Sequence, residues 1–296
     1  MELTKPTAIF TKPNMFSDSI AYLEHYDFSR GNLSNDTRIA NITFVASICY
    51  QSPKSFGSES LYNRLMAESK GLPSSSFEFI PMLFNYADLC YDLRLKGSSI
   101  EETNMLKFGE VIMHAGVEYL LTNFRAVVYD FENLLIDYRD HFNTEAECQI
   151  IAKHFKVFKV HVDMPTLGQM VRHRVNWQVL SRRYVSGSRV PFDFYVADQM
   201  KHVTSTVGYS EISTGLTAST RDIIAICLEH YKAALAAGVK PQVARGIIPQ
   251  CAYTVAWCAF QPTQLSNFFK LRDDSHAQWE IQQVALAIKE AINDKT

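Results

Sequence analysis

The sequence predicts an α+β fold in which a mixed antiparallel sheet packs against long helices. Several segments of the 296-residue chain repeat apolar residues at helical spacing. Other segments, such as 158–162, alternate apolar and polar residues as a half-buried strand does. Because no repeat, low-complexity tract or linker separates them, we expect a single domain over 1–296 with a helical insertion at about 85–153.

The composition indicates a globular protein with a sizeable core, since 47% of the residues are hydrophobic and 20% are charged. A net charge of −2 argues against a general nucleic-acid binder. The first residues contain no apolar signal segment and no run is long enough to span a bilayer, so we expect a cytoplasmic protein without membrane association. The six scattered cysteines form no CxxC pair, which predicts neither disulfides nor a metal site.

Helix and strand signals divide the first half of the chain. Residues 44–50 form its most buried-looking run, and residues 77–84 are expected to form a strand. Ser58 is placed to cap a helix over 58–66. Another helix is expected over 123–138, capped by Thr122 or Asn123, with an apolar stripe of Phe124, Val127, Val128, Phe131 and Leu134.

In the second half, Pro165 opens a helix that is expected to continue into a basic stretch at 172–184. The later elements are a helix capped at Ser219 or Thr220 and ended by Gly238, a short helix from Pro241, a strand over 251–260, a helix from Pro262 and a last helix from about Ser275.

The basic stretch concentrates four arginines, one histidine and two aromatic residues within thirteen positions. Guanidinium groups bind planar or tetrahedral anions through paired hydrogen bonds, and they also stack on rings. This combination favours a site for a phosphate joined to a flat heterocycle. A solvated basic helix face is the alternative, although Val175, Val179 and Leu180 draw the segment toward a core. The chain has no glycine-rich phosphate loop, so side chains and helix ends would hold any nucleotide.

Three further polar positions belong with this stretch. Gln169, Arg172 and His173 stand at i, i+3 and i+4, so they would share one face of the expected helix. Arg245 lies among apolar residues, where either a buried carboxylate or a ligand phosphate would balance its charge. Arg272 is followed by two aspartates, so a local salt bridge is the alternative to a ligand there.

The basic stretch and the C-terminal quarter together resemble the flavin-dependent thymidylate synthases, which make thymidylate from dUMP. That family's signature is Arg-His-Arg, seven residues and then Ser, with Ser-x-Arg-Tyr as its tail. The matching residues are Arg172-His173-Arg174, Ser181-Arg182-Arg183-Tyr184 and two C-terminal blocks at 243–249 and 267–281. Weaker matches lie at 47–50, at 75–78 and at 122–125, the last resembling an element of a helical insertion in one branch of the family.

The resemblance implies the fold of that family and roles for individual residues. FAD would be bound by Ser75, Arg172, His173, Arg174, Asn267 and His276. The phosphate and sugar of dUMP would be bound by Gln169, Arg172, Ser181, Arg182, Arg183 and Arg245. Arg272 would be the catalytic residue, lying against the pyrimidine and stabilising the base deprotonated at N3, because a fixed cation lowers a barrier where negative charge develops.

The resemblance also implies NADPH as the reductant, methylenetetrahydrofolate as the carbon donor, and a homotetramer with active sites shared between subunits. The chain departs from the family pattern at four places, two of which are Phe79 and Pro73, where histidines are usual. Arg174 and Ser181 are separated by six residues, and Val179-Leu180 stand where a polar residue and a glutamate usually precede the serine. Gln261-Pro262-Thr263 replaces an Asn-Ala-Arg block that contacts flavin.

These departures keep two alternatives open beside thymidylate synthesis. One is a relative with altered chemistry, such as hydroxymethylation of dUMP or action on dCMP. The other is a nucleotide-binding protein without catalysis.

Overall fold

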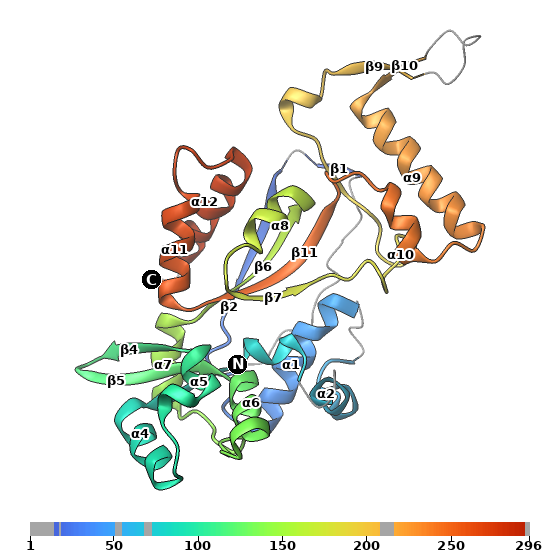
Figure 1. The fold of residues 1–296 in the computed structure, drawn as a ribbon. Helices are drawn as coiled ribbons and strands as arrows, with labels where there is room; N and C mark the ends of the chain where they lie inside the picture. Colours follow the sequence, from blue (N-terminus) through green and yellow to red (C-terminus); the bar gives the residue numbers. More distant parts are fainter. Residues whose placement is uncertain (1–14, 18, 51–54, 68–72, 208–215, 294–296) are drawn as a thin grey trace.

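A computed structural model describes residues 15–17, 19–50, 55–67, 73–207 and 216–293. It shows antiparallel sheets packed with helices, which confirms the predicted α+β class (Figure 1). The central sheet has the strand order β2-β6-β11-β7 and is antiparallel throughout. Its strands are β2 (Ala21–Tyr26), β6 (Lys156–Asp163), β7 (Asn176–Val179) and β11 (Tyr253–Phe260).

Helices cover both faces of this sheet and bury its two inner strands. On one face, α12 packs with its residues at the predicted core spacing, and on the other α1 places Phe44 against Trp257 at 5.5 Å between ring centroids. The predicted buried segment at 44–50 is therefore the end of a helix. The covering helices are α1 (Asn35–Tyr50), α8 (Met164–Met170), α11 (Pro262–Arg272) and α12 (Trp279–Asn293).

The segment 85–153 contains helices, as expected, and also a β-hairpin that the sequence analysis missed. This hairpin joins β3 in a second antiparallel sheet of order β3-β5-β4. Asn123 caps α6 by accepting a hydrogen bond from the Ala126 amide at 3.1 Å, which confirms that predicted helix start. The elements are β3 (Pro81–Asn85), α4 (Tyr86–Leu95), η3 (Ile100–Glu102), α5 (Asn104–Lys107), β4 (Glu110–His114), β5 (Val117–Asn123), α6 (Phe124–Leu134) and α7 (Glu145–His154).

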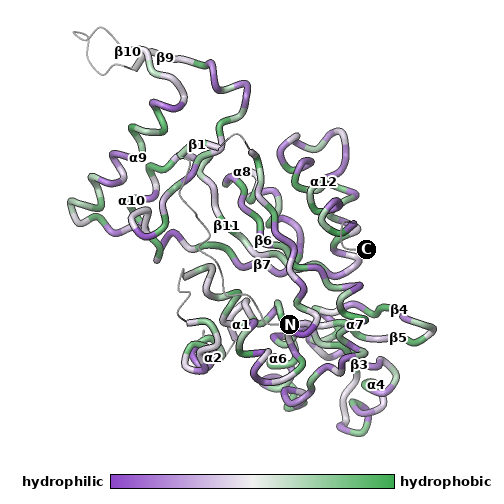
Figure 2. The backbone as a smooth tube through the Cα atoms, turned by 180° about the vertical axis from the view of Figure 1, so that it is seen from behind, coloured by the Kyte–Doolittle hydropathy of each residue, from purple (hydrophilic) through white to green (hydrophobic). Residues whose placement is uncertain are grey.

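A helical arm extends from the start of β11, and Figures 1 and 2 show it projecting away from the central sheet. Ser219 caps α9 and Gly238 follows its end with a φ of 85°, as the sequence predicts. The tube of α9 alternates between hydrophobic and hydrophilic residues in Figure 2, because only one stripe packs inward. The arm comprises η4 (Asp198–Met200), β9 (Thr204–Val207), β10 (Leu216–Ser219), α9 (Thr220–Ala236), α10 (Pro241–Ala244) and η5 (Arg245–Ile247).

Four short elements complete the described chain, and one of them corrects a prediction. Ser58 caps α2 (Glu59–Met66), as predicted. The expected strand over 77–84 is wrong in its first half, because Ser74 caps a 3-10 helix, η2 (Ser75–Phe79), and only then does β3 begin. The minor strands β1 (Phe16–Ser17) and β8 (Phe194–Tyr195) pair in parallel.

The helix opened by Pro165 ends sooner than predicted. It stops at Met170, residues 172–175 form a turn, and β7 begins at Asn176. Arg172 therefore does not share a helix face with Gln169. The apolar residues of this stretch lie on or next to β7, which pairs with β11. The backbone hydrogen bonds of this pairing stabilise a strand here more than the local spacing of side chains favours a helix.

The polar face of β6 is also more buried than the alternating pattern predicts. Lys159 and His161 are only 4% and 8% exposed. The ammonium group of Lys159 donates to the Glu24 carboxylate on the neighbouring strand at 2.5 Å, which offsets part of the cost of burying its charge.

Candidate functional site

The site is centred on a contact between His173 and Arg272. Arg272 Nε donates to His173 Nε2 at 2.8 Å, and Arg272 Nη2 donates to the Gln169 carbonyl at 3.2 Å. His173 is 6% exposed, and its ring meets the Phe268 ring edge-on at 4.9 Å. Burial first, and then the Arg272 charge, lowers the pKa of His173, so its ring is neutral at pH 7. Because Nε2 accepts, the remaining ring proton lies on Nδ1.

Five of the residues that the resemblance assigns to flavin or base line one cavity of about 460 Å³ around this contact, which we call the RHR cavity. They are Arg172, His173, Arg174, Asn267 and Arg272. Burial and the nearby Arg172 charge lower the pKa of Arg272. The two aspartates after Arg272 do not pair with it, because Asp273 binds Lys289 and Asp274 binds His276.

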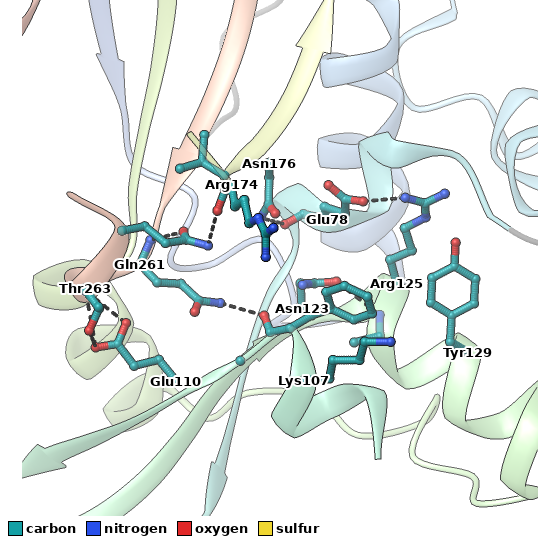
Figure 3. A pocket seen from close by; sticks show the side chains of 15 residues that line it. Glu78, Lys107, Glu110, Asn123, Arg125, Tyr129, Arg174, Asn176, Gln261 and Thr263 are labelled. Atoms are coloured by element: carbon teal, nitrogen blue, oxygen red, sulfur yellow. Dashed lines mark hydrogen bonds and ion pairs between the residues drawn. The ribbon is translucent and has the colours of Figure 1, made fainter. Parts of the chain in front are cut away.

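A larger cavity of about 720 Å³ adjoins the RHR cavity, and we call it the insertion cavity (Figure 3). The two cavities share Arg174, Val175, Thr263 and Gln264 in their walls. Other walls come from α5, β4 and α6 of the 85–153 segment. In Figure 3, Arg174 extends into the cavity from the turn before β7, while Lys107 and Arg125 come from the insertion.

Hydrogen bonds join the 85–153 segment to the N-terminus of α11 at this cavity. The Glu110 carboxylate accepts from the Thr263 amide at 3.0 Å and from its hydroxyl at 2.5 Å. Gln261 Nε2 donates to the Phe108 carbonyl at 3.0 Å, and Gln264 Nε2 donates to the Arg174 carbonyl at 2.9 Å. Gln261 and Thr263, which stand at the place of the Asn-Ala-Arg block, thus bind the 85–153 segment.

Arg125 is held in place on one side of the insertion cavity. Its Nη1 pairs with the Glu78 carboxylate, and its Nε donates to the Pro73 carbonyl at 2.8 Å. The guanidinium carbon lies 5.2 Å from the centre of the Tyr129 ring. Burial raises the pKa of Glu78, and the Arg125 charge opposes that rise.

A third cavity, of about 710 Å³, lies at the start of β11, and we call it the Arg182 cavity. It gathers Ser181, Arg182 and Arg245, three of the residues assigned to the nucleotide phosphate and sugar. Arg182 Nη1 donates to the Val190 carbonyl at 2.5 Å, and its guanidinium lies 4.1 Å from the centre of the Phe192 ring. Burial lowers the pKa of Arg182 to about 10, so the group stays charged at pH 7.

The side chain of Arg245 is exposed, so it does not lie in the apolar setting that its sequence neighbours indicate. Its apolar neighbours Val243 and Ile247 are exposed as well, because α10 and η5 are short elements on the surface of the arm.

Four predicted site residues line none of these three cavities. Ser75 hydrogen-bonds Gln178 Oε1, Gln169 hydrogen-bonds Gln278, Arg183 lies exposed beside Tyr184, and the His276 side chain is 94% exposed and paired with Asp274. No sequence pattern points to Lys107, Glu110 or Tyr129, which also line the insertion cavity. Only Arg125 had a signal, because it ends the matching segment 122–125.

The Arg182 cavity and the RHR cavity lie at opposite ends of β11. Tyr253 and Thr254 line the first cavity, whereas Thr263, just beyond the strand, lines the second. Eight residues of extended strand separate the two ends, which corresponds to roughly 25 Å at about 3.3 Å per residue.

Within the described ranges, no three His, Cys, Asp or Glu side chains converge as metal ligands would. None of the helices in that part of the chain combines the length and apolar character needed to cross a bilayer.

The fold and cavities define an α+β protein with clustered arginines suited to anionic ligands, and sequence comparison supplies its family. The chain belongs to the family described as Thymidylate synthase complementing protein, whose profile matches residues 144–296. The matched region contains the RHR and Arg182 cavities, whereas Lys107, Glu110 and Arg125 precede it.

Relatives with assigned functions are similar over about half of the chain. A flavin-dependent thymidylate synthase of Thermotoga neapolitana is 32% identical over 142 residues, covering 47% of this chain and 62% of that protein. One of Thermosipho africanus is 33% identical over 149 residues, covering 47% of this chain and 64% of that protein. The chain therefore spans less than two thirds of the length of these curated relatives.

Among solved structures, the UMP/dUMP methylase PolB from Streptomyces cacaoi is 25% identical. The alignment covers 47% of this chain and 69% of that one, with a TM-score of 0.37.

Proposed function

We propose that the chain is a flavin-dependent thymidylate synthase, which methylates dUMP reductively at C5 using methylenetetrahydrofolate, FAD and NADPH. The observation that supports this most directly is the buried contact between His173 and Arg272, which fixes a cation at the wall of the RHR cavity. It lies in the part of the chain that matches the family.

The RHR cavity suits a flavin by the chemistry of its walls. Arg172, Arg174 and Asn267 have exposed side chains, and neither arginine forms an ion pair within the described part of the chain. Their N–H groups are therefore available to the carbonyl and phosphate oxygens of a flavin. A bound flavin would supply the hydride that reductive methylation requires.

Arg272 would act on the pyrimidine as a fixed cation. Two of its hydrogen bonds go to His173 and to the Gln169 carbonyl, so its guanidinium cannot swing freely. A charge held in this way stabilises a base deprotonated at N3 without reorganising as negative charge develops. The neutral His173 accepts from Arg272 and therefore fixes its orientation.

The nucleotide phosphate would bind in the Arg182 cavity, at Ser181, Arg182 and Arg245. Within one chain this cavity lies at the far end of β11 from Arg272. We therefore infer a homotetramer with shared active sites, in which the Arg182 cavity of one subunit adjoins the RHR cavity of another. Such an arrangement would join the phosphate-binding and base-binding groups into one site.

A second activity, on dCMP or by hydroxymethylation of dUMP, is favoured by one observation. Val179 and Leu180 line the Arg182 cavity where the family pattern has a glutamate. An apolar wall removes a polar contact to the nucleotide, and a site with fewer polar contacts discriminates less between related nucleotides.

The mass of the product tests these activities. Purified protein would be incubated with FAD, NADPH and methylenetetrahydrofolate, with dUMP and dCMP offered separately, and the nucleotides analysed by mass spectrometry. We expect dUMP to gain one methylene unit. A hydroxymethyl product, or modification of dCMP alone, would establish the second activity, and no product despite bound flavin would contradict both.

A further inference from the structure

The insertion cavity has a cationic character that its own carboxylates do not cancel. Three cations line it, namely Lys107, Arg125 and Arg174. Its two carboxylates are already engaged, since Glu78 pairs with Arg125 and Glu110 accepts hydrogen bonds from Thr263. In the described ranges neither Lys107 nor Arg174 has an ion pair, so two positive groups remain available to a ligand.

Lys107 is positioned by a buried carboxylate of α6, which binds the start of the Lys107 helix, α5. Asp130 is fully buried and accepts from the backbone amides of Asn104 at 2.6 Å and Met105 at 2.9 Å. These bonds fix the first turn of α5, which carries Lys107 at its last position. The location of this cation therefore follows from the packed interior of the insertion.

Aromatic side chains complete the walls. Phe108 is 46% exposed, and the Tyr129 ring is held beside the fixed Arg125 guanidinium. Ligand cavities in proteins typically measure about 300–1,000 Å³ and combine rings with a few polar groups. At about 720 Å³, the insertion cavity is large enough for a ring system with an anionic substituent.

The position of the cavity restricts what it can bind. It shares four wall residues with the RHR cavity, where we place the flavin, so an occupant would lie beside the flavin. It shares no wall residue with the Arg182 cavity, where we place the nucleotide phosphate, so the occupant would be a compound other than the nucleotide held there. A second compound held beside the flavin is placed to exchange a hydride or a carbon unit at the active site.

We propose that the insertion cavity binds the anionic tail of a heteroaromatic co-substrate, with Lys107 and Arg174 binding the tail and Phe108 and Tyr129 contacting its rings. The inference rests on the proposed flavin site. Two co-substrates share this chemistry, because a reduced folate ends in glutamate carboxylates and NADPH contains phosphates. Lys107 lies outside the region that matches the family, so this part of the site belongs to the inserted segment.

Titration calorimetry on FAD-loaded protein tests this assignment, with tetrahydrofolate and NADP⁺ as probes that do not turn over. We expect Lys107→Ala to raise the Kd of at least one probe roughly tenfold, as for a lost hydrogen bond to a charged group. Lys107→Arg should restore most of the affinity. Lys153→Ala provides the matched control, because Lys153 is exposed on α7 in the same segment and lines none of the three cavities.

The outcomes separate the possible ligands. An effect on tetrahydrofolate alone identifies the carboxylate tail, and an effect on NADP⁺ alone identifies the phosphates. Unchanged Kd values for both probes, no binding of either probe to the native protein, or a weakened affinity for FAD alone would each overturn the proposal.

This experiment is independent of the product-mass assay. Conversion of dUMP with Kd values insensitive to Lys107 would leave thymidylate synthesis standing and remove the role of the insertion cavity. Binding that depends on Lys107, with no nucleotide converted, would support the role of the insertion cavity and contradict thymidylate synthesis. Circular dichroism of Lys107→Ala and of Lys107→Gln controls for loss of the fold.

Discussion

Arg272 Nε donates to the buried His173 Nε2 at 2.8 Å, across 99 residues of sequence. This bond joins the end of α11 to the turn before β7 and orients the guanidinium that we place against the pyrimidine.

Arg272→Lys tests the importance of that orientation. A lysine keeps the positive charge and loses both the planar group and the directed Nε bond. We expect turnover of dUMP to fall roughly a hundredfold, as for loss of a preorganised charge-stabilising donor, while bound FAD stays constant. Lys270→Ala, exposed on the same helix, is the control. Equal turnover in Arg272→Lys and the native protein would exclude this role.

Asp130→Asn tests the positioning of α5. The new amide would present N–H groups to backbone N–H groups that now bind a carboxylate. We expect the free energy of unfolding to fall by about 2 kcal/mol, the usual cost of unsatisfied buried donors. Urea denaturation measures it, with Glu132→Gln, exposed on the same helix, for comparison. An unchanged midpoint would show that α5 does not depend on Asp130.

Arg38→Lys tests a buried arginine that joins α1 to the segment after α6. Its guanidinium lies between the rings of Phe124 and Phe142 and donates to the Asn32 side chain and to two backbone carbonyls. Lysine cannot reproduce this planar set of bonds. We expect the free energy of unfolding, measured by thermal or urea denaturation, to fall by about 3 kcal/mol. The exposed Arg64→Lys should change it very little. A loss below about 1 kcal/mol would contradict this account.

His161 should make stability depend on pH. Burial first, and then the Lys159 charge, lowers its pKa from 6.5 to about 4. Between these values the unfolded chain binds a proton that the folded chain does not, so the free energy of unfolding falls as the pH drops. The decline should approach about 3 kcal/mol by pH 4.

His161→Gln should remove this part of the decline when urea unfolding is compared at pH 7.5 and 4.5. The exposed His202→Gln should leave it in place. The same pH dependence in His161→Gln and the native protein would assign the effect to other groups.

The helix caps were predictable because their signals are local. Ser58, Asn123 and Ser219 accept hydrogen bonds from amides three residues ahead, so sequence spacing alone locates them. The β4–β5 hairpin had no comparable signal. Its turn places Ala115 and Gly116 at φ values of 49° and 80°, where Asn-Gly is the usual sequence.

Sequence motifs point to individual residues of the candidate site, whereas the contacts between distant segments that arrange the site have no sequence signal. The resemblance assigns Arg172, His173, Asn267 and Arg272 to flavin or base, and these four residues line one cavity. Residues of the insertion cavity meet through contacts across long separations, such as that between Glu110 and Thr263, 153 residues apart. No local pattern encodes such a contact, and the end of α8 likewise depended on the pairing of β7 with β11.

The position of β7 at the edge of the sheet also has an evolutionary consequence. The residue that this chain lacks relative to the family pattern falls between Arg174 and Ser181, which is the interval that β7 occupies. An edge strand pairs on one side only, so a deletion there costs few ladder hydrogen bonds and leaves the other strands in register. The same deletion in β11, which pairs on both sides, would turn every following side chain to the opposite face. Divergence in length can therefore accumulate next to the residues that we propose bind the nucleotide, while the core of the protein is preserved.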